Sequence, residues 1–205
     1  MLSSVGCDRC AGAVEGEGGG RAISAHGRAK SAYLGRTVDP LIVLEPVFAD
    51  QVCAVYRWRA LIVLSWHGTP TASGMGPMTQ AVLAIVRKNP SNFVMCALTG
   101  AHSPLPDAET RAALKAGIQR IGNLHGAVNM IAGSGFRAAS LRALLSGFSL
   151  VLRPKYPVAF VGTETEAASF LAARWPEQDA PVPGRIELAS ALTRVAPDQV
   201  ARRSA

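Results

Sequence analysis

Strand-like and helix-like segments alternate along the middle of the chain, and this alternation constrains the fold more than any other feature. Between the strand-like runs, apolar residues recur at helical spacing. Strands joined by helical crossovers must pair mainly in parallel, because a crossover returns the chain to the same edge of the sheet. The first two runs are separated by only a few residues and predict a hairpin, which makes the sheet mixed. The strand-like runs are residues 52–56, 61–66, 93–98, 127–132 and 158–161.

Local signals predict where the first two core helices begin and end. Pro77 predicts the start of the first helix, because proline is tolerated in a first turn, and Asn89 followed by proline predicts its end. Asp107 predicts the start of the second helix, where an acidic residue suits the helix dipole. The inward stripe predicted for that helix is Leu114, Ile118, Ile121 and Leu124.

Two further helices complete the pattern. Residues 136–150 carry leucines at helical spacing and predict the third helix. Thr163 and Glu166 have the spacing of a capping box and predict the start of the fourth. The predicted order is therefore a hairpin followed by alternating helices and strands, which indicates the α/β class.

Composition sets the domain boundaries. With 49% hydrophobic and 17% charged residues, the chain of 205 residues cannot be disordered throughout. No apolar run approaches the roughly 20 residues that span a bilayer, so no transmembrane segment is expected. We predict a disordered head at 1–40, one α/β domain at 41–175, and a flexible tail rich in Pro, Ala and Arg at 176–205. The tail has room for one short helix, at 186–195.

The chain is basic, with 21 Lys and Arg against 14 Asp and Glu. The surplus lies between residues 46 and 175, and a basic core could favour an anionic partner. The favoured interpretation of this surplus charge is that it serves solubility and reflects the arginine-rich composition that a GC-rich genome encodes. Nucleic-acid binding is not expected, because no recognised module and no interleaved aromatic residues accompany the charge. A solvated basic face is predicted around the third helix, from Arg137, Arg142, Arg153 and Lys155.

The cysteines predict neither a metal site nor a cofactor. Cys7 and Cys10 have CxxC spacing, but zinc needs about four ligands and no second pair is present. Cys53 and Cys96 lie in apolar runs and predict small buried side chains. The first residues lack the basic and apolar regions of an export signal, which favours a cytoplasmic protein.

No set of residues predicts catalysis. The loop of Gly133, Ser134 and Gly135 follows a strand and precedes a helix, but Ala138 replaces the third glycine of a dinucleotide motif and no acidic residue follows at the spacing of a ribose contact. A simple turn is the favoured interpretation. Three histidines lie near element ends without a carboxylate to complete a triad: His67, His102 and His125. We predict that the protein is not an enzyme, with an uncharacterised enzyme as the weakest alternative.

The element order and several local segments together resemble the SpoIIAA-like branch of the STAS superfamily, small domains related to anti-sigma-factor antagonists. The resemblance covers about residues 52–175. The segments that carry it are Trp66-His67-Gly68-Thr69-Pro70-Thr71, Pro106-Asp107-Ala108-Glu109, Phe136-Arg137-Ala138-Ala139-Ser140-Leu141-Arg142-Ala143-Leu144, Pro157-Val158-Ala159-Phe160 and Thr163-Glu164-Thr165-Glu166-Ala167-Ala168.

This resemblance implies a mixed, mainly parallel sheet of four to five strands with helices packed mainly on one face. It implies a non-enzymatic interaction or regulatory domain that contacts a regulator or kinase in bacterial signalling. In the family, a serine at the start of the second helix is phosphorylated; Ser103 is the nearby residue here, although two prolines replace the motif. The implied partner-binding residues are His102, Ser103, Asp107 and Arg137. The alternative function is a carrier or sensor of a small apolar or anionic, lipid-like ligand between sheet and helices.

Overall fold

The computed structural model describes residues 41–197, except residues 90, 101, 102, 105, 134 and 153. It describes no side chains for residues 137, 141, 144 and 148–152. The predicted disordered head at 1–40 therefore lies outside the described residues, and so does the predicted CxxC pair. The described residues all belong to one compact unit, Val38–Ala205.

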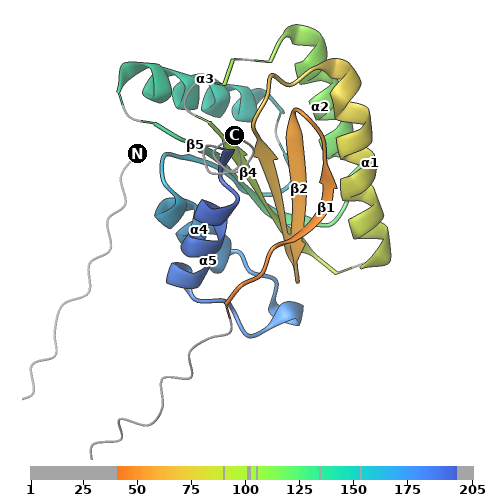
Figure 1. Ribbon diagram of the computed structural model, residues 1–205, viewed down its shortest axis with the longest axis vertical. Helices are drawn as coiled ribbons and strands as arrows, with labels where there is room; N and C mark the ends of the chain where they lie inside the picture. The colour runs from red at the N-terminus through yellow and green to blue at the C-terminus, as the bar shows by residue number, and fades with distance from the viewer. Residues whose placement is uncertain are drawn as a thin grey trace, which may run out of the picture. The chain divides into compact units, whose positions relative to one another are not determined.

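Six strands within the described residues form one sheet, in which their spatial order is the same as their order in the chain. The first three strands pair antiparallel, and each later strand pairs parallel to the one before it. The predicted α/β class and the mixed sheet are confirmed (Figure 1). The strands are β1 (Glu45–Ala49), β2 (Cys53–Trp58), β3 (Leu61–Trp66), β4 (Phe93–Thr99), β5 (Leu124–Ile131) and β6 (Val158–Val161).

The sheet has one strand more than the four to five that were predicted. The additional strand, β1, is short, contains Pro46 and is largely exposed, so its own sequence carries little strand signal. It becomes a strand by pairing with β2, where Phe48 lies opposite Val55 after a bulge. Its position at the edge of the sheet explains why the proline is tolerated, since an edge strand need not donate every N–H.

In the part of the chain that the structure describes, five α-helices and one 3-10 turn accompany the sheet. Helices α1 and α2 cover one face, and α4 and α5 cover the other (Figure 1). The prediction that helices pack mainly on one face is therefore wrong. The elements are α1 (Ala72–Lys88), α2 (Ala108–Gln119), α3 (Phe136–Leu152), α4 (Glu164–Ala173), η1 (Glu177–Asp179) and α5 (Arg185–Arg194).

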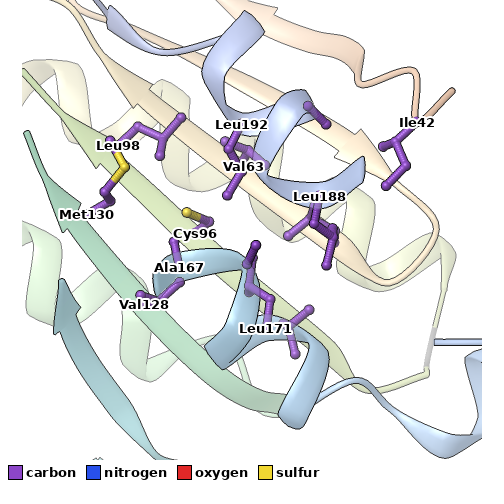
Figure 2. Packing of buried hydrophobic residues seen from close by; sticks show 14 of the residues in the cluster. Ile42, Val63, Cys96, Leu98, Val128, Met130, Ala167, Leu171, Leu188 and Leu192 are labelled. Carbon is purple, nitrogen blue, oxygen red and sulfur yellow. The ribbon is translucent and has the colours of Figure 1, made fainter. Parts of the chain in front are cut away.

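The central strands explain why both faces are covered. In β3, Ile62 and Leu64 point to the core beneath α1 and α2, whereas Leu61 and Val63 point to the core beneath α4 and α5. Successive residues of a strand face opposite sides of the sheet. A strand that is apolar at every position therefore needs a helical layer on each side. Figure 2 shows the second core, where Val63 packs near residues of α5.

Two predicted helix boundaries change. Helix α1 begins five residues before Pro77, because the hydroxyl of Thr71 accepts a hydrogen bond from the Gly74 N–H and caps the helix there. Helix α2 ends at Gln119, so Leu124 is not part of its inward stripe but the first residue of β5. The Asp107 cap and the capping box at Thr163 are confirmed.

Residues 176–197 are a packed part of the domain, whereas a flexible tail was predicted from residue 176. Leu188 and Leu192 of α5 are fully buried in the same core as Leu171 of α4 (Figure 2). The buried hydroxyl of Ser65 in β3 donates a 2.6 Å hydrogen bond to the carbonyl of Val195 and holds the end of the helix. The domain therefore extends well beyond the predicted end at residue 175.

Candidate ligand-binding cavity

Small side chains on two central strands leave space beneath the helical layer formed by α2 and α3. On β3, the large side chains of Ile62 and Leu64 fill the core under α1. Opposite Leu64, β4 presents only Ala97, and Ala127 occupies the next row of β5. A cavity of about 580 Å³ lies over these small residues. This volume lies within the roughly 300–1,000 Å³ range of sites that hold small molecules.

The cavity is lined mainly by apolar side chains from the sheet floor and from α2. Helix α2 contributes one face, at positions 110, 114 and 118, which are one turn apart. The opposite wall comes from Leu145 of α3 and from the connection that enters β6. The apolar lining residues include Trp66, Met75, Met95, Ala97, Leu114, Ile118, Ile121, Leu124, Ala127, Leu145, Tyr156, Val158 and Phe160.

The cavity extends along the strands of the sheet. Its lining on β5 runs from Leu124, at the amino end of the strand, to Asn129, near the carboxyl end. At about 3.3 Å per residue, this stretch of strand is roughly 16 Å long. The cavity is therefore long enough to hold an extended chain along the strands.

Polar groups are concentrated at the two ends of the cavity. Toward the carboxyl ends of the strands lie Thr99, Ser103 and Asn129. Asn129 lies between Ala97 and Phe160 in the sheet, is half-buried, and makes no side-chain hydrogen bond within the part of the chain that the structure describes. Its carboxamide is therefore available to a polar group of a ligand.

The opposite end of the cavity carries the charged groups. Lys115 of α2 and Lys155 of the connection before β6 both line it, and both are exposed. Tyr156 lines the same end, and burial raises the pKa of its hydroxyl. Tyr156 therefore stays protonated at neutral pH and can act as a hydrogen-bond donor.

Of the predicted partner-binding residues, two have described side chains. Ser103 is half-buried and lines the cavity, and its N–H donates to the carbonyl of Gly100. Asp107 is exposed and caps α2; the Thr110 N–H lies 2.7 Å from its carboxylate and is the main cause that holds its pKa below the ordinary value. Ser103 phosphorylation and partner binding stay predictions.

The other two predicted partner-binding residues are described incompletely or not at all. His102 lies outside the described residues, and for Arg137 only the backbone is described, in the first turn of α3. Because β4 and β5 are parallel, the loop after β4 and the start of α3 lie at the same edge of the sheet. The backbone positions of Ser103, Asp107 and Arg137 therefore share that edge.

The two described histidines contact main-chain carbonyl groups. His67 Nε2 lies 2.9 Å from the Asp50 carbonyl oxygen, and His125 Nδ1 lies 3.0 Å from the Arg174 carbonyl oxygen. Neither ring has a carboxylate as its hydrogen-bond partner among the residues that the structure describes. Both histidines thus tie segments of the fold together, and neither has the partner that a general base of a triad requires.

Two other groups that the sequence singled out also serve the fold. Arg142 of α3 donates hydrogen bonds to the carbonyls of Ile131 and Gly133. It therefore provides partners for backbone carbonyl groups at and after the end of β5 and does not face only water. Cys53 and Cys96 are buried, as predicted. Burial raises the pKa of both thiols, that of Cys53 to about 12, so neither is a reactive thiolate at neutral pH.

The residues that shape the cavity were not identified from the sequence. Ala97 and Ala127 look like ordinary residues of a buried strand in the sequence. Their small size matters only because helices α2 and α3 lie above them in the fold. Asn129 did carry a signal, since it is the one amide in the apolar strand Leu124–Ile131. A half-buried amide without a hydrogen-bond partner among the described residues is a candidate ligand contact.

Comparisons of the chain with protein-family models, curated proteins and solved structures found no match. No helix within the described residues is both long and apolar enough to cross a membrane. The same residues contain no group of three or more His, Cys, Asp or Glu side chains that could hold a metal ion.

Proposed function

We propose that this domain binds a small, elongated and mainly apolar ligand, as a carrier or a sensor, in the cavity between β4–β6 and helices α2 and α3. The observation that carries the proposal is the cavity itself, with its apolar walls and its alanine floor. An apolar pocket with a few polar groups at defined points is the usual form of a small-molecule site. Each methylene group removed from water contributes about 0.8 kcal/mol, so even a short chain gains appreciable affinity.

The test is binding of a neutral apolar fluorophore, N-phenyl-1-naphthylamine, to the full chain. We expect saturable binding with a stoichiometry near one. Ala127→Phe places an aromatic ring on the cavity floor and should abolish this binding, because Ala127 is buried and lines the cavity. The matched control is Ala84→Phe, at an exposed position of α1 that does not line the cavity.

Two outcomes contradict the proposal. One is that the probe does not bind the unmodified protein. The other is that it binds Ala127→Phe and Ala84→Phe equally well. If Ala127→Phe fails to fold by circular dichroism, the smaller change Ala97→Leu fills the same floor and replaces it. Mass spectrometry of an organic extract of the purified protein provides an independent measurement, in which a stoichiometric co-purified apolar molecule is expected.

A second candidate function, a regulatory interaction domain of bacterial signalling, is favoured by one exposed side chain. Phe136, at the start of α3, is 89% exposed. It lies at the same edge of the sheet as Ser103 and Asp107, and aromatic residues are common anchors of protein interfaces. A protein partner docking there would lie next to the cavity. Phe136→Ser should weaken capture of such a partner without lowering the stability of the domain.

The element order supports relating the domain to the SpoIIAA-like branch. From β3 onward, four strand–helix units follow one another in sequence and in space. The additional strand β1 and the packed helix α5 depart from the arrangement that the resemblance implies. We therefore propose the relationship on topology alone, and the function on the cavity.

A further inference from the structure

We propose that the ligand is a single-chain amphiphile whose anionic headgroup lies against Lys115 and Lys155. This inference rests on the proposed function and specifies its ligand class. The lining of the cavity includes two charged side chains, and both are lysines; no Asp or Glu is among the lining residues within the described part of the chain. The charge of the rim is therefore of one sign.

The fold places both lysines toward the same end of the cavity. Lys115 lies in the second half of α2, which leads toward the amino end of β5, and Lys155 lies in the connection that enters β6. Because β5 and β6 are parallel, their amino ends meet at one edge of the sheet. Both lysines are exposed, as are Gln119 and Gly122 of the same rim. The cavity thus has one solvent-exposed end that carries positive charge.

Among the residues that the structure describes, no ion pair neutralises the positive charge at this rim. The salt bridge found among the described residues is between Arg59 and Asp179, and neither rim lysine takes part in one. Uncompensated charge next to an apolar wall attracts counter-ions more strongly than the same charge on an open surface, because the wall excludes water. An anionic group is the complement of this rim.

The residues next to the rim accommodate an apolar chain. Leu124, Ala127 and Val158 follow inward from the cationic end along the sheet floor. The methylene stems of the lysines can pack along a bound chain while their ammonium groups stay in water. Lysine acts as a point charge and not as a planar fork, so the rim selects for negative charge and accepts a carboxylate or a phosphate.

The experiment measures displacement of N-phenyl-1-naphthylamine by three ligands with the same chain: dodecanoate, dodecyl phosphate and dodecanol. It compares the unmodified protein with the double variant Lys115→Met, Lys155→Met. Methionine keeps an unbranched side chain and removes the charge. The matched control is Lys88→Met, at an exposed lysine in the last turn of α1 that does not line the cavity.

We expect the preference for the anions over dodecanol to fall roughly tenfold in the double variant, because two exposed ion pairs together contribute about 1.4 kcal/mol, which is a factor of ten. It should be unchanged in Lys88→Met. An unchanged preference in the double variant overturns the inference while leaving the cavity as a binding site. If neither the probe nor any of the three ligands binds the unmodified protein, the proposed function itself fails.

Discussion

Arg59 connects the β2–β3 hairpin to the C-terminal part of the domain. Its guanidinium forms a salt bridge with the Asp179 carboxylate, with an N–O distance of 3.2 Å, and donates to the carbonyls of Asp179 and Pro181. It also lies over the rings of Trp58 and Trp175, 5.1 and 5.6 Å from their centroids. One side chain thus makes ionic, hydrogen-bond and cation–π contacts between segments about 120 residues apart in the chain.

The backbone conformation of Arg59 makes it possible to measure the contribution of the side-chain contacts separately from that of the turn. Arg59 is the first residue of a two-residue hairpin turn and has φ of 50°, in the left-handed region that favours glycine. A residue with a side chain, including Arg59 itself, is strained in this conformation by about 1–2 kcal/mol. The protein therefore accepts an unfavourable backbone conformation at the position from which the arginine reaches Asp179.

We predict that Arg59→Ala lowers the free energy of unfolding by about 2 kcal/mol, because it removes the charged hydrogen bonds and leaves the strained turn. Arg59→Gly removes the same contacts but relieves the strain, so it should be about 1 kcal/mol more stable than Arg59→Ala. Urea denaturation followed by tryptophan fluorescence measures both. Equal stability of the two variants would contradict the left-handed backbone conformation at Arg59. A loss of less than about 0.5 kcal/mol in Arg59→Ala would show that the side-chain contacts contribute little to stability.

Helix α5 is an element whose importance comes from its packing and not from its helical propensity. It has ten residues, and isolated helices of that length are marginal in water. Three of its side chains, Leu188, Ala191 and Leu192, have no exposed surface. They cover the face of β3 and β4 that α4 alone leaves open. The helix is therefore part of the second core.

We predict that Leu188→Ala lowers the free energy of unfolding by about 3 kcal/mol, which is typical when a buried leucine leaves a cavity. The matched control is Ile186→Ala in the same helix, where the side chain is 75% exposed and the change should be within about 0.5 kcal/mol. Both values come from urea denaturation. Similar, small effects at the two positions would mean that α5 does not pack against the sheet as described.

Ligand binding should act on the stability of the whole domain, because the cavity lies between the sheet and its helices. A ligand that binds only the folded state at a hundred times its dissociation constant stabilises that state by about 2.7 kcal/mol. We predict a shift of this size in urea denaturation with dodecanoate below its micelle concentration. Ala127→Phe should show no shift. A shift of equal size in that variant would place the binding site outside the cavity.

Most of the sheet could be predicted from the sequence, because its central strands are apolar over their whole length. The strands at 61–66 and 158–161 have the predicted bounds, and the caps at Asp107 and Thr163 mark helix starts through contacts within four residues. Errors arose where the deciding contact is distant. Strand β1 was missed because it depends on its pairing with β2. The short helix expected at 186–195 is present as α5, but its packing was missed because it depends on the sheet face that the helix covers.

The sequence by itself determined the α/β class, the order of the elements from β2 to α4 and the helix starts at Asp107 and Thr163, since these follow from local periodicity and capping. Only the tertiary structure decided that both faces of the sheet are covered and that the C-terminal segment is packed. It also decided the cavity, because an empty volume is a property of several elements at once. Ala97 and Ala127 leave space only because α2 and α3 stand above them. Lys115 and Lys155 share a rim only because parallel strands bring distant segments to one edge of the sheet.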